Sequence, residues 1–303
     1  MAVQPRIAVI GAGLMGHGIA QVFARAGLNV RVYDTSAAML ATLYQRICGN
    51  LIDLGQDAAA ADRVSGHSDL AEAVAEATFV FEAGPEKLKL KQQIFADIEA
   101  AAAPEAILAS NTSVIPITQI MHLLRVPGRA LGTHWWNPPY LVPLVEVIRT
   151  PATSTASVES MTALLSAAGK TPVTVEKDVP GFVGNRLQHA LWREAIALVQ
   201  NGVCDASTVD TVVKASFGRR LAVLGPLENA DLVGTDLTLA IHETVLPDLD
   251  RTPGALPLLR QLVEDGKLGM KSGEGFRHWN AEQQAALRVR VLKHLQALEQ
   301  QGV

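Results

Sequence analysis

Two ionisable residues interrupt an apolar stretch of the chain, THWWNPPYLVPLVEVI at positions 133–148. His134 ends one apolar run just before an Asn-Pro-Pro turn, and Glu146 lies within a second apolar run. A histidine can exchange a proton near neutral pH because its ordinary pKa is about 6.5, and a carboxylate beside it can fix its tautomer. The two residues could therefore form an acid–base pair. The alternatives are that His134 is only a structural residue at a strand end and that Glu146 faces solvent from an edge strand.

A glycine-rich segment near the start of the chain has the spacing of a dinucleotide-binding turn. The run Arg6–Ile10 leads into GAGLMG at positions 11–16, a helical pattern follows, and the run Asn29–Tyr33 ends at Asp34. The first glycine permits the tight turn, the second lets the backbone approach a pyrophosphate, and the third lets helix and strand pack closely. Asp34 would accept hydrogen bonds from the ribose hydroxyls, and NAD is favoured over NADP because no arginine directly follows it. The predicted cofactor-binding residues here are Gly11, Gly13, Leu14, Met15, Gly16 and Asp34.

The two halves of the chain differ in their pattern. In the first half, strand candidates alternate with helical segments, which predicts an α/β domain with a Rossmann-type, doubly wound and mostly parallel sheet. The further strand candidates are Thr78–Phe81, Ile107–Ser110, Ala130–His134, Leu144–Ile148 and Pro172–Val175. The second half is helical, with one long amphipathic helix from Phe182 to Leu198 and four more segments around Val209–Ala215, Leu237–Val245, Leu256–Val263 and Ala281–Leu298. We expect a nucleotide-binding domain at residues 1–179 and an all-helical substrate and dimerisation domain at residues 180–303.

Composition narrows the class of protein. The chain has 303 residues, 49% of them apolar and 18% charged, which is ordinary for a soluble globular protein of one or two domains. A net charge of −4 gives no reason to expect nucleic acid or an anionic membrane as a partner. No apolar run is long enough for a membrane span, and a strand pattern begins too early for a signal peptide. Cys48 and Cys204 lie far apart, which favours a reducing cytoplasm, and the histidines show no metal-ligand spacing.

Several motifs, in order along nearly the whole chain, resemble those of the 3-hydroxyacyl-CoA dehydrogenase family. They are GAGLMGHGIAQ (11–21), FEAGPEKLKLK (81–91), ASNTS (109–113), THWWNP (133–138), VPLVEVI (142–148), DVPGFVGNR (178–186) and KLGMKSGEGF (267–276). The resemblance implies that His134 is the catalytic base and Glu146 its partner. It implies that Ser113 and Asn185 contact the substrate. The residues that it places near the nicotinamide ribose are Glu86, Lys91 and Asn137.

The implied reaction suits these residue types. Oxidation of a secondary alcohol requires a base for the hydroxyl proton while a hydride moves to the nicotinamide, and His134 could serve as that base. Glu146 would stabilise the imidazolium that forms. Ser113 and Asn185 could donate hydrogen bonds to the reacting oxygen, where the charge changes most. Each of these polar residues could instead be structural or surface-exposed, since residue type alone does not place them in one site.

The chain departs from the CoA-dependent members of this family in two segments. Residues 41–69 contain two arginines, no lysine and four aspartates, which is a poor site for the phosphates of CoA. Residues 216–224 read SFGRRLAVL and are more similar to relatives that act on small free acids, such as gulonate 3-dehydrogenase (lambda-crystallin), carnitine dehydrogenase and a formyl-pyridine carboxylate dehydrogenase. Arg220 could bind a free carboxylate or could be a solvated surface charge. Trp135 and Trp136 replace the family's usual phenylalanines and could either reshape a substrate pocket or pack the core.

We therefore expect an NAD-dependent dehydrogenase that oxidises the 3-hydroxy group, or an equivalently placed one, of a small carboxylate. The rival enzyme is a short-chain 3-hydroxyacyl-CoA dehydrogenase. The rival of another class is a non-catalytic nucleotide-binding protein, as crystallins can be. An apolar helical second domain favours a homodimer, and the two distant cysteines favour the cytoplasm. The exact substrate, the physiological direction and the orientation of Arg220 do not follow from the sequence.

Overall fold

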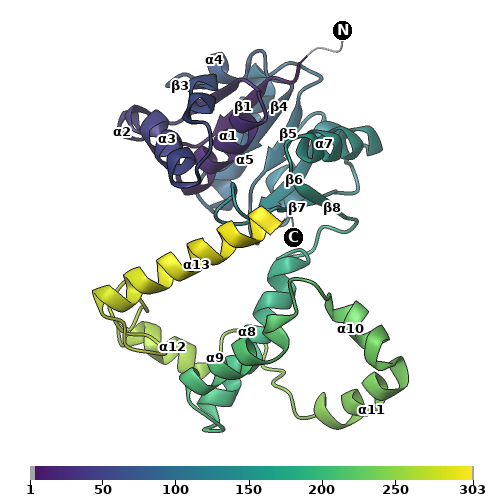
Figure 1. Cartoon of the computed structure of the whole chain (residues 1–303). Helices are drawn as coiled ribbons and strands as arrows, with labels where there is room; N and C mark the ends of the chain where they lie inside the picture. The colour runs from purple at the N-terminus through teal and green to yellow at the C-terminus, as the bar shows by residue number, and fades with distance from the viewer. Residues whose placement is uncertain (1–3, 302–303) are drawn as a thin grey trace. The chain divides into compact units, whose positions relative to one another are not determined.

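The computed structural model describes residues 4–301, which form two compact units (Figure 1). Unit 1 comprises residues 1–186 and unit 2 comprises residues 187–303. Each unit has its own set of secondary-structure elements. Within residues 4–301, all of the strands belong to unit 1. Helix α8 and the helices that follow it belong to unit 2, except that the first residues of α8 lie in unit 1.

Unit 1 is built on one eight-stranded sheet with the order β3-β2-β1-β4-β5-β6-β7-β8. Its strands are β1 (Ile7–Ile10), β2 (Val30–Tyr33), β3 (Val64–His67), β4 (Phe79–Glu82), β5 (Ile107–Ser110), β6 (Ala130–Trp135), β7 (Leu144–Ile148) and β8 (Thr171–Val175). Neighbouring strands are parallel except β6 and β7, which are antiparallel. The carboxyl ends of β1, β2, β4, β5 and β6 therefore meet at one edge of the sheet, where open α/β sheets bind their ligands.

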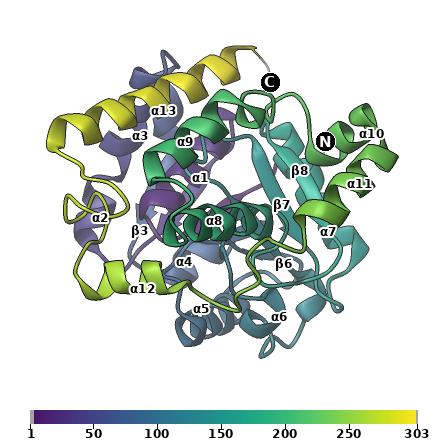
Figure 2. The ribbon, with the colours of Figure 1, turned by 90° about the horizontal axis from the view of Figure 1, so that it is seen from below.

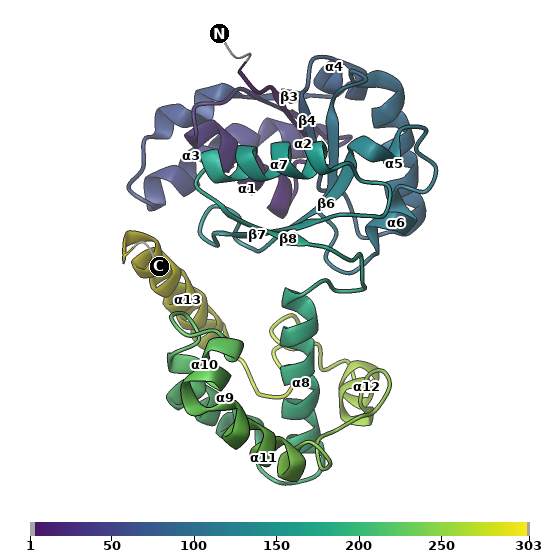
Figure 3. The ribbon, with the colours of Figure 1, turned by 90° about the vertical axis from the view of Figure 1, so that its right-hand side faces the viewer.

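Helices cover both faces of this sheet (Figures 2 and 3). Apolar side chains of α1, α3 and α7 pack on one face, and those of α4, α5 and α6 pack on the other. The helices of unit 1 are α1 (Leu14–Arg25), α2 (Ala37–Ala41), α3 (Leu43–Asp53), α4 (Leu70–Val74), α5 (Leu88–Ala101), α6 (Ile117–Ile120) and α7 (Thr155–Ala167), with short 3-10 turns at Ala58–Arg63 and Pro127–Arg129. Because both faces are covered, β1, β4 and β5 are buried at every residue, as their unbroken apolar sequences require.

The expected α/β fold is confirmed, with two local differences. Strand β3 was not predicted from its sequence, VSGH, because a short, half-exposed edge strand with a glycine has no alternating apolar pattern. The long helix α8 (Gly184–Gln200) begins two residues later than its apolar pattern indicates. Phe182 adopts a left-handed conformation with φ 52° after Gly181 with φ 76°, so the chain turns here before the helix starts.

The named elements of unit 2 are helices. Besides most of α8, unit 2 contains α9 (Ala206–Ala215), α10 (Pro226–Val233), α11 (Thr235–Val245), α12 (Pro257–Glu264) and α13 (Ala281–Gln301), with a 3-10 turn, η3, at Phe217–Arg219. Isolated β-bridges join Glu274 to Gly269 and to His278 in the segment between α12 and α13. Helices α10 and α11 follow each other directly and are in contact. Helix α10 was not predicted; it begins with Pro226 at its first position, and Glu228 in its first turn accepts a hydrogen bond from the Gly225 N–H.

Candidate active site

His134 and Glu146 face each other across the antiparallel pair of strands β6 and β7. They are direct partners in the strand register, and Nδ1 of His134 lies 2.7 Å from Oε2 of Glu146. Both side chains are buried, with 3% and 1% of their surfaces exposed. An ionised carboxylate can only accept, so Nδ1 donates the proton and Nε2 of the neutral ring keeps its lone pair. The arrangement therefore presents one unprotonated ring nitrogen that can accept a proton.

The other oxygen of Glu146 is held by the start of helix α8. Oε1 accepts hydrogen bonds from the backbone N–H groups of Val183 (2.8 Å) and Gly184 (3.0 Å). Burial alone raises the pKa of Glu146, but the hydrogen bonds from His134, Gly184 and Val183 outweigh it and lower the pKa below its ordinary value. Glu146 is thus kept ionised at neutral pH, and the free N–H groups of a helix N-terminus favour that charge.

Aromatic rings surround His134. The ring of Trp136 lies 5.1 Å from it between centroids, and the ring of Phe182 lies 5.6 Å from it. Gly184 permits this packing, because a Cβ there would come within 2.5 Å of the Trp136 ring. Phe182 was not recognised as a site residue in the sequence, since an aromatic residue after a Pro-Gly turn has no signal that separates it from core packing.

The neighbouring Trp135 points to the opposite face of the sheet, as alternate residues of a strand do. Its ring packs edge-on against Phe23 and Phe81, and only 2% of the residue is exposed. Of the two roles considered for Trp135, this environment favours core packing over contact with a substrate. Trp136 lies on the His134 side and remains available to shape a pocket.

Ser113 and Asn185 are brought together beside the His134–Glu146 pair. The side-chain amide of Asn185 donates to the carbonyl of Ser113 at 2.8 Å. Asn185 directly follows Gly184, whose N–H binds Glu146, so the same turn of α8 contacts both groups. Ser113 is exposed and Asn185 half-buried, and the Ser113 hydroxyl makes no hydrogen bond within the described part of the chain.

Glu86 holds the loop that carries Ser113. One of its oxygens accepts hydrogen bonds from the Thr112 hydroxyl and from the backbone N–H groups of Ser113 (3.0 Å) and Val114 (3.3 Å). Partial burial opposes ionisation of Glu86, but these hydrogen bonds and the charge of Lys91 outweigh it and lower its pKa. Glu86 therefore acts on the site at least through the conformation of the Ser113 loop.

Lys91 is wholly buried and bonded within the chain. Its ammonium donates to Oε1 and Oε2 of Glu82 (2.8 and 3.0 Å) and to the carbonyl of Gly84 (3.3 Å), and it lies 3.4 Å from Glu86. Glu82, also wholly buried, further accepts from the Gly84 N–H (2.7 Å) and the Ser110 hydroxyl (2.6 Å). The network pins the ends of β4 and β5 and the loop between β4 and α5. Glu82 was missed in the sequence, although an acid that ends the apolar run FVFE is its visible signal.

The glycine-rich turn after β1 has the shape that a dinucleotide requires. Gly11 has φ 108°, and a Cβ there would come within 2.8 Å of the Ala83 carbonyl; a Cβ on Gly16 would collide with the Gly11 carbonyl. A Cβ on Gly13 would meet no atom within 4 Å, so the backbone there is open to a pyrophosphate. At the end of β2, Asp34 accepts from the Ala12 N–H at 2.7 Å. These residues fit NAD at the start of α1.

The remaining predicted site residues lie elsewhere. Asn137 is exposed just after Trp136 and precedes Pro138 through a cis peptide bond. Arg220 is exposed in unit 2, immediately after η3, and so belongs to a different unit from the other site residues. Within residues 4–301 no group of three or more His, Cys, Asp or Glu side chains is placed to hold a metal ion. None of the helices described has both the length and the apolar character of a membrane span.

Comparison with known proteins identifies the same two domains. Residues 6–179 match the 3-hydroxyacyl-CoA dehydrogenase NAD binding domain, and residues 181–279 match the 3-hydroxyacyl-CoA dehydrogenase C-terminal domain. The chain is 35% identical to 5-formyl-3-hydroxy-2-methylpyridine 4-carboxylate 5-dehydrogenase of Mesorhizobium japonicum over 297 residues, 96% of both chains. It is 40% identical to L-carnitine dehydrogenase of Streptomyces griseus over 233 residues, 76% of this chain and 70% of the relative. Curated 3-hydroxybutyryl-CoA dehydrogenases also match.

A solved structure agrees over almost the whole chain. The crystal structure of a 5-formyl-3-hydroxy-2-methylpyridine 4-carboxylic acid 5-dehydrogenase, described as an NAD-dependent dismutase, superposes with a TM-score of 0.91 at 34% identity and covers 98% of each chain. The expected resemblance is thereby confirmed, as is NAD as the cofactor. The chain belongs to the 3-hydroxyacyl-CoA dehydrogenase family and is an NAD-dependent oxidoreductase that acts on CH–OH groups.

Proposed function

We propose that this enzyme oxidises the 3-hydroxy group, or an equivalently placed one, of a small free carboxylate, with His134 as the general base. The observation that carries the mechanism is the buried pair in which Glu146 accepts from Nδ1 of His134 and is itself held by two backbone N–H groups. A purely structural histidine has no need of an ionised, doubly anchored carboxylate. The same pair weighs against a non-catalytic, crystallin-like protein.

The path of the substrate proton follows from this geometry. Nε2 of His134 accepts the hydroxyl proton of the substrate, and Glu146 stabilises the imidazolium that results. Bound NAD would supply the acceptor for the hydride on the carbon that bears this hydroxyl. Ser113 and Asn185 bind the substrate oxygen as it becomes a carbonyl, and in the reverse direction His134 returns the proton to that oxygen. Trp136 and Phe182 exclude water from the ring, which strengthens its interaction with Glu146. The nicotinamide ribose is supported by Glu86 and Asn137. Lys91 supports it indirectly, because Lys91 holds the loop between β4 and α5.

A small acid fits this chain better than a CoA thioester. Of the two arginines in residues 41–69, Arg46 is already partly engaged, since one of its Nη atoms donates to the carbonyl of Met39 at 2.9 Å. Arg63 alone does not supply the several cations that those phosphates need. The relatives named for a pyridine carboxylate and for carnitine act on free acids by their names. We therefore expect a free carboxylate as the substrate.

An absorbance assay of NADH formation tests the substrate class. A panel of free 3-hydroxy acids and hydroxylated ring carboxylates is offered with NAD, and acetoacetyl-CoA is offered with NADH for the reverse reaction. Turnover of at least one free acid, with a kcat/KM above that for the thioester, supports the proposal. Activity confined to the thioester would instead make the enzyme a short-chain 3-hydroxyacyl-CoA dehydrogenase. NAD binding without turnover of any compound would favour the non-catalytic alternative.

Replacing Arg220 by methionine is expected to raise KM for the carboxylate substrate by roughly tenfold to a hundredfold, because two charge-assisted hydrogen bonds are lost. The value of kcat should change little, since the carboxylate is bound equally in the ground and transition states. The measurement is steady-state kinetics on the best acid of the panel. Arg219→Met removes a neighbouring exposed charge and is the matched control. Equal KM values for the two variants would mean that Arg220 is a solvated surface charge that does not bind the substrate.

We also propose that residues 1–179 bind NAD and that residues 180–303 bind the substrate and form a homodimer. We place the protein in the cytoplasm, because Cys48 and Cys204 can stay unpaired in that reducing compartment, as they are here. The dimer is supported by the surface of unit 2. Between residues 187 and 299 only Ala197 and Leu256 are buried apolar residues, whereas large apolar side chains such as Leu227 (80%) and Leu232 (73%) are exposed. A helical domain needs to bury such faces to be stable.

The exposed area supports the same conclusion. The chain exposes 16814 Å². Two separate globular domains of these sizes would together expose about 14,800 Å², by the usual scaling of surface with mass. The excess of roughly 2,000 Å² is comparable with the surface that one chain buries in an obligate homodimer. This excess supports a second copy of this chain as the partner of the exposed faces.

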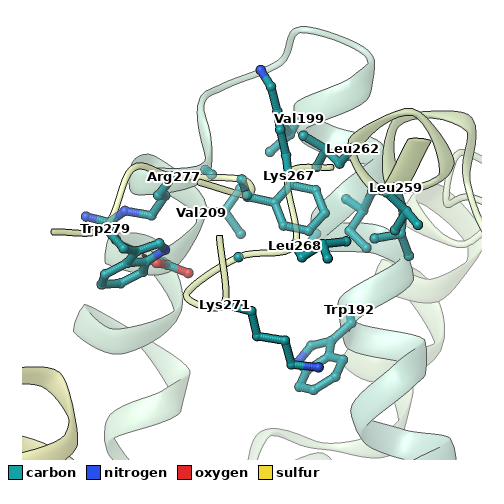
Figure 4. Close-up of a pocket in the computed structure, with 18 residues that line it drawn as sticks. Trp192, Val199, Val209, Leu259, Leu262, Lys267, Leu268, Lys271, Arg277 and Trp279 are labelled. Carbon is teal, nitrogen blue, oxygen red and sulfur yellow. Dashed lines mark hydrogen bonds and ion pairs between the residues drawn. The ribbon is translucent and has the colours of Figure 1, made fainter. Parts of the chain in front are cut away.

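One part of this surface is a cavity of about 610 Å³ within unit 2 (Figure 4). Apolar side chains of α8, α9 and α12 line it, among them Trp192, Val209 and Leu262, and the segment 267–279 closes one side. Three cations, Lys267, Lys271 and Arg277, line it, of which Lys267 and Arg277 pair with Glu274 and Asp210. Helices α10 and α11 carry four carboxylates and no lysine or arginine. This charge complementarity favours the α10–α11 face of the second copy as the occupant of the cavity.

Replacing Val263 by glutamate is expected to dissociate the dimer. Val263 lines the cavity and is 56% exposed in the single chain, so a glutamate there is harmless unless a second copy covers it. Burial of an unpaired carboxylate costs several kcal/mol, which should raise the dimer dissociation constant by roughly a hundredfold or more. Sedimentation equilibrium measures this, with Ser207→Glu on exposed α9 as the control. A monomeric native chain, or a dimer unaffected by Val263→Glu, would contradict the proposed surface.

A further inference from the structure

The segment that leads into helix α8 contains two successive residues in the left-handed conformation. Residues 179–182 read VPGF, with proline second and glycine third as in a type II turn. The Phe182 N–H closes this turn by donating to the Val179 carbonyl at 3.0 Å, and Gly181 has φ 76°. Phe182 follows with φ 52°, and within residues 4–301 no other residue besides glycine has a positive φ. A bulky side chain disfavours this conformation, so the surrounding structure must maintain it.

Tertiary contacts fix Phe182 in place. Its side chain is wholly buried in the apolar core of unit 1, and its ring lies 5.6 Å from the ring of His134. The Gly181 carbonyl accepts from the Arg186 N–H at 3.3 Å, which ties the turn to the first residues of α8. The next side chain, that of Val183, is 51% exposed, so the burial at this turn comes from Phe182. A disfavoured conformation that is maintained beside an active site points to a function of the turn.

The turn directs two backbone N–H groups to Glu146. Successive N–H groups in a turn can converge on one anion. Here the N–H groups of Val183 and Gly184 donate to the same oxygen, Oε1, at 2.8 and 3.0 Å. The other oxygen, Oε2, lies 2.7 Å from Nδ1 of His134. A carboxylate held at Oε1 cannot rotate away from the ring, so the conformation of the turn controls the geometry of the pair.

We propose that Gly181 and Phe182 are positioning residues for the reaction. Their left-handed conformation places two N–H groups on Glu146, and Glu146 in turn keeps the proton of His134 on Nδ1. Phe182 therefore does more than exclude water from the imidazole. The inference rests on the proposed role of the His134–Glu146 pair, but not on the identity of the substrate.

Gly181→Ala tests the inference, because it opposes the conformation of the turn without a steric clash. A Cβ on Gly181 would approach no atom beyond its chain neighbours closer than 3.6 Å, whereas a positive φ is unfavourable for alanine. We expect kcat, measured on the compound that the native enzyme turns over best, to fall by roughly tenfold to a hundredfold, since two hydrogen bonds to a charged group are weakened. The Kd of NADH, titrated by fluorescence, should stay within about twofold, because the glycine turn after β1 is unchanged.

Gly27→Ala is the matched control. Gly27 has φ 83°, and a Cβ there would meet no atom within 4 Å. It precedes the amino end of β2, at the edge of the sheet opposite the site. Both variants should lower the melting temperature by similar amounts, but only Gly181→Ala should lower kcat. In a Glu146→Gln background, Gly181→Ala should cause little further loss of kcat, because it acts through that carboxylate.

Equal kcat values for Gly181→Ala and Gly27→Ala would overturn the inference, as would an undiminished further loss in the Glu146→Gln background. If Gly181→Ala does not fold, Gly181→Asn takes its place with Gly27→Asn as the control, since asparagine tolerates the left-handed conformation better than alanine. The fall in kcat should then be smaller and still confined to the variant at residue 181. Failure of the proposed mechanism would appear separately, as near-native turnover in His134→Gln.

Discussion

Replacing His134 by glutamine is expected to lower kcat by roughly 10²–10⁴, the usual loss when a general base is removed. Glutamine keeps a polar side chain of similar length but cannot accept and carry a proton near neutral pH. NAD affinity should stay within about twofold of the native value, because we place the nucleotide at the glycine turn after β1 and not at this side chain. Steady-state kinetics on the best substrate and a fluorescence titration of NADH measure the two quantities.

Two further variants help to interpret this result: one is a control, and the other tests the role of Glu146. His122→Gln changes an exposed histidine after α6 and should leave kcat unchanged. Glu146→Gln keeps the imidazole but places an amide beside Nδ1, and an amide N–H there favours the tautomer with its proton on Nε2. That tautomer cannot accept the substrate proton, so kcat should again fall by orders of magnitude. Near-native turnover in His134→Gln would remove this residue from the mechanism.

Replacing Lys91 by methionine is expected to destabilise unit 1 by about 3–5 kcal/mol, because it leaves the wholly buried carboxylate of Glu82 without its counter-charge. The loss should appear as a lower midpoint of urea denaturation. The loop that carries Glu86 would also be released, since Lys91 holds both the Gly84 carbonyl and the charge of Glu86. A weaker affinity for NADH should therefore accompany the loss of stability.

Two further variants separate the effect of the lost charge on stability from the effect of the lost packing. Lys89→Met removes an exposed lysine from the same helix, α5, and should change stability by less than about 0.5 kcal/mol. The double variant Glu82→Gln with Lys91→Met removes both buried charges and should recover part of the lost stability, since replacing a whole buried pair is far less costly than breaking it. A native midpoint in Lys91→Met, or no recovery in the double variant, would contradict the ion-pair explanation.

Much of the fold could be predicted from local patterns. The strands at Ile107–Ser110 and Leu144–Ile148 have the bounds expected from their apolar runs, because a strand buried on both faces requires such a run. The glycine turn could also be recognised, since its strand, its glycines and its helix are consecutive. Strand β3 could not, because its residues at the sheet edge carry too little apolar pattern to be distinguished from a loop.

The types of the site residues could be predicted as well, but not their surroundings. Trp135 and Trp136 are adjacent and chemically identical, and only the direction of strand β6 puts one ring in the core and the other beside His134. Glu82 was not expected, because its partners Lys91 and Ser110 lie nine and 28 residues away. Sequence patterns report periodicity and composition over short distances, whereas these contacts join separate elements.

The sequence by itself determined the nucleotide turn, the α/β and helical halves, and the presence of a histidine and a glutamate in apolar surroundings. These depend on neighbouring residues, whose spacing dictates which face of a strand or helix is buried. Only the tertiary structure decided that β6 and β7 pair in the register that joins His134 to Glu146, and that α5 carries Lys91 to Glu82. Strand register and helix packing arise from contacts between distant segments, and the chemistry of this site depends on those contacts.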